Sequence, residues 1–313
     1  MDELAPIIIF TYNRPEPTRI TLEYLHQCTL ADQSTLYAFC DGPKAGATQA
    51  TIDSIQQVQD VLRSKQWTKE VIIHASAVNK GLFENVVSGI EEVVRQYKKC
   101  IVIEDDLKIG KGFLNYMNNA LRRYKDEKNV KQVSGFIFPV QLPRTNSALF
   151  LPVTNTIGWG TWERAWNEVD LDATGYKMLA TDQALRDKFN LHGVYDYSSM
   201  LEKQMQNHQY GSWGIIYWWS VFKNNGVVLY PDYSLIQHND FDHSGVHKSD
   251  DSHYNYNYWD EDYTIHSFPD ICLFEKTDVH EKIRVHLQKR NKYSFKNIKI
   301  KLVMIFNKIF KQQ

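Results

Sequence analysis

Three consecutive acids directly follow three β-branched residues, and this combination constrains the chain more than any other feature. The run 101–103 predicts a buried strand, and Glu104, Asp105 and Asp106 come at its carboxyl end. Adjacent carboxylates repel one another, so a folded protein keeps them together where a cation, a ligand or water screens their charge. An isolated acidic run is more often a solvated loop. In open α/β sheets, however, ligands bind at the carboxyl ends of strands, which favours a divalent metal site here.

Strand-like and helix-like segments alternate through the first 129 residues. Apolar runs predict strands at 6–11, 36–40, 71–73 and 101–103, and helical spacing is present at 52–62, 83–97 and 113–124, after a first helix opened by Pro15 and Pro17. This alternation predicts an α/β fold with a mostly parallel sheet flanked by helices. From about residue 130, short strands and tryptophan-rich loops follow, with a helix predicted within 158–166 and a strand at 227–230.

The composition argues against several classes of protein. A net charge of -1 over 313 residues argues against nucleic-acid binding, which requires a basic surface. The cysteines lack the paired spacing of a zinc or redox motif, so we expect reduced, packed thiols at Cys28, Cys40, Cys100 and Cys272. The acidic N-terminus lacks the basic and apolar parts of a signal peptide, and no segment reaches the roughly 18 apolar residues of a membrane span. We therefore expect a cytoplasmic protein.

The tail has an amphipathic pattern of its own. One helical face carries apolar side chains, namely Phe295, Ile298, Leu302, Ile305, Phe306, Ile309 and Phe310, while lysines occupy much of the rest. This pattern predicts a C-terminal amphipathic helix. Such a helix suits the surface of an anionic membrane, which would place the protein at the inner face of the cell membrane. The same pattern fits a helix packed on its own domain or on a partner subunit.

Four short segments, taken in order, resemble the nucleotide-sugar glycosyltransferases of the GT-A fold. They are IIIFTYNRP at 7–15, FCDGPK at 39–44, NKGL at 79–82 and VIEDDLKIGKGFLNYM at 102–117. The first looks like the nucleotide-binding turn of bacterial family-2-like sugar transferases. The last resembles the Glu-Asp-Asp segment of the animal N-acetylglucosaminyltransferase that begins complex N-glycans. The resemblance implies a GT-A (Rossmann-like) domain over 1–270, with a nucleotide-binding half at 1–129, an acceptor-binding half at 130–270 and a tail at 271–313.

The resemblance also implies roles for individual residues. Asp106 would bind Mn²⁺ or Mg²⁺, Asp105 would contact the ribose or the water shell of the metal, and Glu104 would bind donor hydroxyls or water. The rest of the nucleotide site would comprise Thr11, Asn13, Arg14, Asp41 at the uracil, Asn79 and Gly81. The segment SGVH, residues 244–247, resembles the ending in which a late histidine completes the metal site, which implies that His247 is a ligand. His238, His243 and His253 are expected to be solvated side chains.

The catalytic base cannot be assigned from these segments. In the resembling enzymes it lies just after a tryptophan, and the matching position here is Gly214, after Trp213. An inverting transferase would then need a base from elsewhere, and the candidates are Asp240, Asp242, Glu163 and Asp196, of which we choose Asp242. A retaining mechanism would need no separate base. The aromatic faces of Trp159, Trp162 and Trp213 are candidate walls for sugars, whereas Trp166, Trp218 and Trp219 are expected in the core.

The leading hypothesis is a metal-dependent glycosyltransferase that moves a hexosyl or N-acetylhexosaminyl group from a UDP-sugar to a glycan or lipid-linked acceptor in bacterial surface polysaccharide synthesis. Two other classes stay open. A metal-dependent phosphohydrolase or nucleotidyltransferase would also place acids after a strand, but it would need further carboxylates for a second metal. A non-catalytic module that binds nucleotide-sugars or glycans would be consistent with a glycine at the expected base position.

Overall fold

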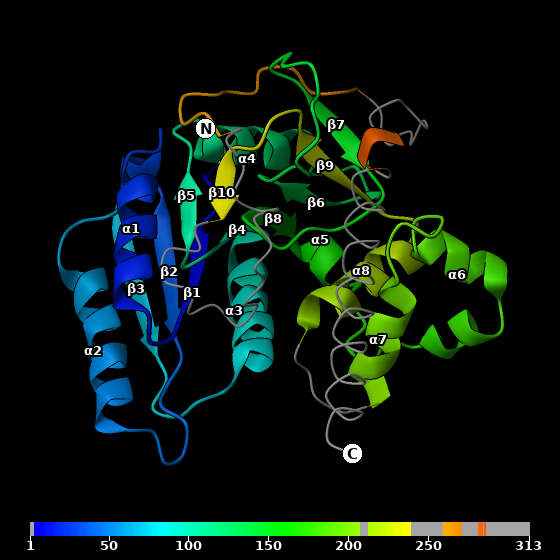
Figure 1. The fold of residues 1–313 in the computed structure, drawn as a ribbon. Helices are drawn as coiled ribbons and strands as arrows, with labels where there is room; N and C mark the ends of the chain where they lie inside the picture. Colours follow the sequence, from blue (N-terminus) through cyan, green and yellow to red (C-terminus); the bar gives the residue numbers. More distant parts are fainter. Residues whose placement is uncertain (1–2, 207–211, 239–258, 271–280, 284, 286–313) are drawn as a thin grey trace, which may run out of the picture.

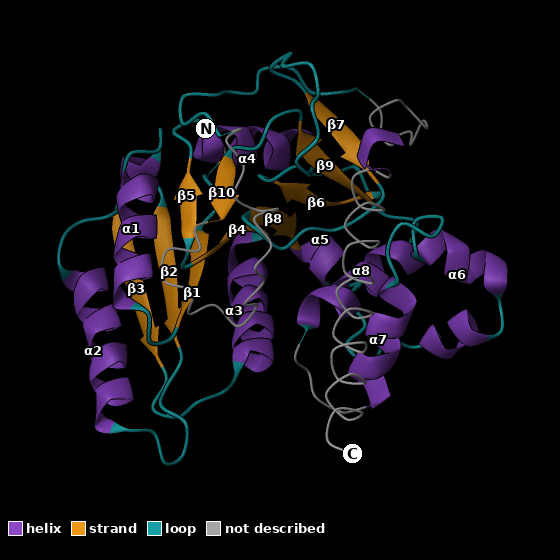
Figure 2. Cartoon of the chain, viewed as in Figure 1, coloured by secondary structure: helices purple, strands orange, loops and turns teal. Residues whose placement is uncertain are grey.

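The computed structural model describes residues 3–206, 212–238, 259–270, 281–283 and 285. In these ranges the chain forms an eight-stranded sheet flanked by helices, next to a second sheet of two strands (Figures 1 and 2). The strands are β1 (Ile7–Thr11), β2 (Thr35–Cys40), β3 (Glu70–Ala75), β4 (Lys99–Glu104), β5 (Leu107–Ile109), β6 (Val130–Ser134), β7 (Ala148–Leu151), β8 (Trp159–Trp162), β9 (Val227–Pro231) and β10 (Ile236–His238).

The α-helices are α1 (Pro15–His26), α2 (Gln49–Arg63), α3 (Leu82–Tyr97), α4 (Phe113–Arg123), α5 (Glu163–Trp166), α6 (Gln183–Phe189), α7 (Tyr197–Gln206) and α8 (Trp213–Lys223). Short 3₁₀ helices lie at Ala31–Gln33 and Tyr176–Ala180. The predicted α/β fold is confirmed. None of the described helices is long and apolar enough to cross a membrane.

The first half of the large sheet is parallel, in the order β3-β2-β1-β4. The chain moves outward from β1 to β3 and then returns across the sheet to β4. Because parallel crossovers are right-handed, this reversal places α3 on the face opposite α1 and α2. The position between β1 and β4 is therefore the topological switch point, where α/β sheets bind ligands.

The second half of the sheet is mixed. β8 is antiparallel to both β4 and β6, β9 is parallel to β6, and β7 is antiparallel to β9. Two reversals across β8 leave β4, β6 and β9 running in the same direction as β1. The carboxyl ends of all these strands consequently meet at one edge of the sheet, and the loops that follow them form the candidate site.

Strand β8 corrects the prediction of a helix within residues 158–166. Trp159 pairs with Val102 of β4 and with Ser134 of β6, and only residues 163–166 form a helical turn. Trp159 and Trp162 are buried, with 0% and 3% exposure. A strand between two others can bury side chains on both faces, so it lacks the polar alternation that would identify it.

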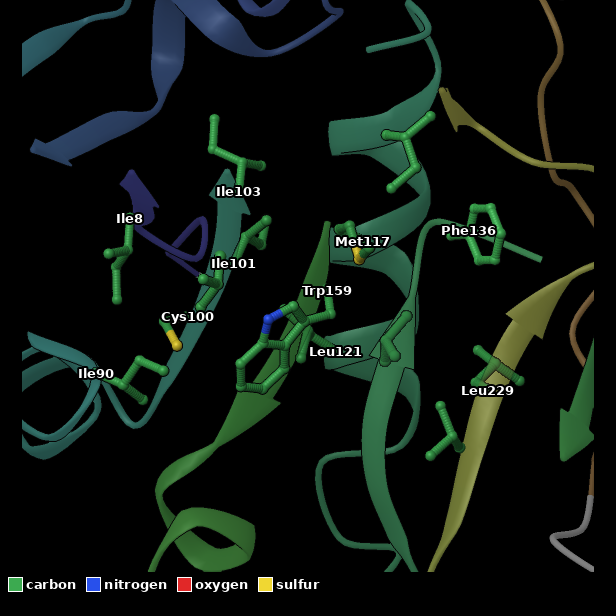
Figure 3. Packing of buried hydrophobic residues seen from close by; sticks show 14 of the residues in the cluster. Ile8, Ile90, Cys100, Ile101, Ile103, Met117, Leu121, Phe136, Trp159 and Leu229 are labelled. Atoms are coloured by element: carbon green, nitrogen blue, oxygen red, sulfur yellow. The ribbon is translucent and has the colours of Figure 1, made fainter. Parts of the chain in front are cut away.

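The core joins both halves of the sheet (Figure 3). Ile8 and Trp159 lie on one face of the sheet, whereas Ile101 lies on the other face, where Leu121 of α4 packs near Gly160. Each fully buried side chain of this kind contributes about 1.5–3 kcal/mol to folding. Of the cysteines, Cys28, Cys40 and Cys100 are free and buried, whereas Cys272 lies outside the described residues.

Candidate active site at the carboxyl edge of the sheet

Arg14 and the acidic triplet meet at the switch point. Arg14 directly precedes α1, and the triplet begins with the last residue of the neighbouring strand β4. The Arg14 guanidinium donates through Nη2 to Asp105 Oδ1 and, at 2.8 Å, to Asp106 Oδ2, and through Nε to Asp105 Oδ2 at 3.3 Å. The turn is held on α1, because Leu107 N–H donates to Thr21 Oγ1 at 2.9 Å. The segment before α1 and the turn after β4 thus hold the Arg14 guanidinium against the carboxylates of Asp105 and Asp106.

His238 completes a cluster with two of these acids. β10 pairs antiparallel with β5, and the register places His238 opposite Leu107, the residue after Asp106. His238 Nε2 lies 3.5 Å from Asp106 Oδ2. One ligand atom from each of Glu104, Asp106 and His238 lies within 4.8 Å of the others. The expectation that His238 is simply a solvated side chain is therefore wrong.

This cluster has the chemistry of a metal site. Asp106 is 6% exposed, and its Oδ1 is buried without a hydrogen-bond partner among the described residues. An unpaired buried carboxylate oxygen carries a large desolvation cost, which a bound cation would offset. Two carboxylates and an imidazole are ordinary ligands of divalent ions. The residues present therefore fit the divalent metal that the sequence implies.

The surroundings raise the pKa of two acids in the triplet. Burial, with the nearby Asp106 and Asp105 carboxylates, raises the pKa of Glu104 to about 8, against the opposing effect of Arg14. Burial also raises the pKa of Asp105 to about 6, and the hydrogen-bonded Arg14 limits this rise. In the absence of a bound metal, Glu104 therefore tends to keep its proton near neutral pH.

Asp41 is the centre of a second hydrogen-bond network, at the end of β2. Its Oδ1 accepts from Gly42 N–H at 2.9 Å and Lys80 N–H at 2.7 Å, and its Oδ2 accepts from Asn79 Nδ2 at 2.9 Å and Gly81 N–H at 3.0 Å. A carboxylate offers about four lone-pair positions, so this turn supplies enough donors to occupy them. Asp41, Asn79 and Gly81 therefore lie together, in direct contact with one another. Recognition of uracil by Asp41 stays a prediction.

The other predicted donor residues lie along the same edge. Thr11 is buried at the end of β1, and its hydroxyl donates to Cys40 Sγ at 3.2 Å, so its side chain joins β1 to β2. Asn13 is half-buried next to Arg14. His247 and Asp242 lie outside the described residues, as do Asp240, His243 and His253.

Several acceptor-side predictions require correction. Glu163 follows β8 at the opposite edge of the sheet, where Trp162 pairs with Lys99 at the start of β4, so it cannot be the base. Trp159 and Trp162 are core residues and cannot be walls for sugars. Trp213 is half-buried and stacks on Trp159 with ring centroids 5.6 Å apart. Asp196 supports the start of α7 by accepting from Ser199 N–H at 3.2 Å. The expected core positions of Trp166, Trp218 and Trp219 are confirmed.

A cavity of about 330 Å³ opens among the loops that follow β6 and β9. Its lining is mostly apolar and includes Phe136, Phe138, Val140 and Leu142, with Arg144 among its polar groups. Ile236 and Gln237 of β10 also line it, and the next residue is His238 of the acidic cluster. The cavity and the cluster are therefore neighbours along one strand.

The chain is similar to several solved structures, although no protein-family model and no curated protein matches it. One is S. aureus TarS, with 14% identity, 42% of this chain and 21% of that chain covered, and a TM-score of 0.29. A second is a mannosyltransferase from Pyrobaculum calidifontis in complex with GDP-Man and Mn²⁺, with 10% identity, coverage of 71% and 75%, and a TM-score of 0.37. Mouse xyloside xylosyltransferase 1 has 11% identity, coverage of 70% and 81%, and a TM-score of 0.35.

The matched region spans about a fifth of the TarS chain, at 21%. Two of the matched structures are named as sugar transferases. With TM-scores of 0.37 or less, these likenesses do not establish a family for this chain. The case for its function therefore rests on its own residues.

We predict that the metal-free protein loses stability as the pH rises from about 4.5 toward about 8. The folded state binds the Glu104 proton more tightly than the unfolded chain does. The resulting contribution to the free energy of unfolding is complete below the ordinary carboxyl pKa and is lost as the pH rises through the raised pKa of Glu104. Thermal melts in EDTA across this range measure the effect. Glu104→Gln should have a shallower pH dependence, whereas the exposed Glu84→Gln should follow wild type. Parallel curves for all three proteins would contradict a raised pKa at Glu104.

We also predict that Asp41→Ala destabilises the protein in the absence of any nucleotide. The substitution leaves three backbone N–H groups and one side-chain amide without their acceptor, and an unsatisfied buried donor costs about 1–3 kcal/mol. Chemical denaturation measures the loss, with Asp60→Ala on α2 as the control. A variant as stable as wild type, with a raised KM for the donor, would instead mean that Asp41 contacts the nucleotide directly.

Proposed function

We propose that this chain is a metal-dependent glycosyltransferase that uses a UDP-sugar donor. The observation that supports this function most strongly is the cluster of Glu104, Asp106 and His238, with Arg14 alongside, at the switch point of an α/β sheet. Nucleotide ligands bind at this position in such sheets. A nucleoside diphosphate carries the negative charge that a metal ion and an arginine would neutralise.

Some residues of the site would bind the metal, and others would hold the charged groups and the nucleotide turn in position. A bound divalent ion would act as a Lewis acid on the diphosphate leaving group. Asp106, Glu104 and His238 would hold that ion, and the proton on Glu104 would leave as it binds. Asp105 would orient Arg14 through its two hydrogen bonds. Asp41 would hold the Asn79–Gly81 turn in place beneath the nucleotide.

We infer Mn²⁺ in preference to Mg²⁺ as the metal. Mg²⁺ prefers oxygen ligands in strict octahedral geometry, whereas imidazole suits transition metals. A set of two carboxylates and one imidazole combines these preferences. His247 remains a second proposed ligand, from the resemblance of its segment.

The acceptor would bind at the apolar cavity. This cavity lies at the same sheet edge as the cluster and is connected to it through β10. An apolar lining suits the lipid part of a lipid-linked acceptor or the apolar face of a sugar. We retain Asp242 as the proposed base, because Gly214 offers no acid. A Cβ added to Gly214 would lie 3.3 Å from Thr156 Cγ2, so this position is also closely packed.

The tail would then bring the site to its acceptor. Residues 295–310 lie outside the described residues, and their amphipathic pattern supports a membrane-surface helix at the inner face of the cell membrane. A lipid-linked precursor of a bacterial surface polysaccharide would be found there. Loss of binding to anionic liposomes after truncation at Arg290, with donor hydrolysis retained, would support this placement.

The alternative functions have less support. A two-metal phosphohydrolase needs a second group of ligands, and in the described part of the chain Glu104, Asp106 and His238 form the only such group of three. A non-catalytic binding module would bind UDP-sugars with Mn²⁺ but would not hydrolyse them. Titration with a UDP-sugar panel, followed by a hydrolysis assay with and without Mn²⁺, separates the three functions.

We predict that Asp106→Asn reduces Mn²⁺-dependent UDP-sugar hydrolysis to background, since it removes the central ligand charge. His238→Ala should weaken Mn²⁺ binding about 10-fold or more, because loss of residues that only support metal ligands already costs about 10–100-fold. Calorimetric Mn²⁺ titration and product analysis in EDTA provide the measurements.

The exposed His192→Ala is the matched control for His238→Ala and should bind Mn²⁺ as wild type does. His247→Ala, measured beside them, compares the two candidate histidines directly. Full hydrolysis in EDTA or in Asp106→Asn would eliminate the metal mechanism. Equal binding by His238→Ala and His192→Ala would remove His238 from the site.

A further inference from the structure

Arg14 pairs with the carboxylate at the centre of the metal-ligand cluster. Its side chain is 19% exposed, and those of Asp105 and Asp106 are 10% and 8% exposed. All three groups are therefore largely shielded from water. Salt and solvent screen a charge pair only weakly in such a place. Among the described residues, Arg14 donates to both of these carboxylates and offsets their negative charge.

A metal on the same acids would compete with this arginine. Asp106 Oδ2 already accepts from Arg14 Nη2 at 2.8 Å and has His238 Nε2 at 3.5 Å. A divalent ion bound by Asp106 would share one carboxylate with the guanidinium. Two cations held this closely in a poorly screened site repel each other. Binding of the free metal must therefore work against Arg14.

A nucleoside diphosphate changes this balance. Its oxygens are strong acceptors for a guanidinium, and arginine suits planar, two-point recognition of such groups. A diphosphate that arrives with the metal brings negative charge into the site and offers Arg14 a new partner. The metal would then gain Asp106 while the guanidinium keeps Asp105 and exchanges Asp106 for the diphosphate.

We propose that Arg14 acts as a counter-cation to the acidic cluster. It disfavours binding of the metal alone and favours binding of the metal together with the nucleotide. Arg14 exchanges its contact with Asp106 for the diphosphate, so metal and nucleotide strengthen each other's binding. By linkage, the factor by which UDP raises the affinity for Mn²⁺ equals the factor by which Mn²⁺ raises the affinity for UDP. The inference rests on the proposed function for the metal site at Asp106 and for the identity of the nucleotide.

Mn²⁺ titration of the nucleotide-free full chain, followed by the electron paramagnetic resonance signal of unbound Mn²⁺, tests this role. Neutral variants remove the competing cation, so Arg14→Met and Arg14→Gln should bind free Mn²⁺ about 10-fold more tightly than wild type, within the usual range of coupling between sites. Arg14→Lys keeps the charge and should remain near wild type. Arg19→Met on α1 removes an arginine that pairs with Glu16 and Glu23 and should change nothing.

The same titration with UDP present gives the second readout. UDP should raise the Mn²⁺ affinity of wild type about 10-fold or more, and this enhancement should shrink in both neutral variants. Unchanged or weaker binding of free Mn²⁺ by both neutral variants, with native circular dichroism, would overturn the proposal. That result would leave Arg14 as an orienting residue for the acids.

These results separate the inference from the proposed function. Tighter binding of free Mn²⁺ by the neutral variants supports the role of Arg14 even where no UDP-sugar is hydrolysed. Arg14→Gln retains an amide that can donate to Asp105, so it provides the result if Arg14→Met does not fold.

Discussion

The parallel pairing of β1 with β4 is the constraint on which the site depends. Phe10 lies opposite Glu104, so the turn after β1 and the turn after β4 leave the sheet at the same level. This register brings Arg14 within hydrogen-bond distance of Asp105 and Asp106. A shift of one residue would turn the side chains of β4 to the opposite faces. The core residues Ile8 and Ile101, which are buried on opposite faces of the sheet, hold the register in place.

Local sequence patterns predicted the first half of the fold because β1, β2 and β4 are mostly buried and its helices are amphipathic. Strands β1 to β4 are continuous apolar runs, and α2 to α4 have regular helical spacing. β8 could not be recognised in the same way. Its Trp-Gly-Thr-Trp sequence has no strand period, and it is a strand because β4 and β6 supply partners on both sides. The same burial explains why Trp159 and Trp162 belong to the core.

Some residues of the candidate site could likewise be identified from the sequence, and others could not. The acids and Arg14 could be identified because each follows a strand that the sequence itself reveals. His238 could not, because its place beside Asp106 results from the pairing of β10 with β5, two short strands far apart in the sequence. The apolar pair Leu235 and Ile236 just before it was the available signal, and it is weak. For Asp41, the position after β2 was predictable, but the four donors that surround its carboxylate were not.

The β5–β10 pair has a consequence for how the two halves of the chain depend on each other. Glu104 and Asp106 come from the first half, whereas His238 comes from the second, and the small sheet joins them. A fragment that ended before β6 would retain the acids and Arg14 but would lack the imidazole. Metal affinity at this cluster would therefore measure how completely the second half has docked on the first. Any ion held by all three residues would act as a crosslink that draws its stability from both halves of the molecule.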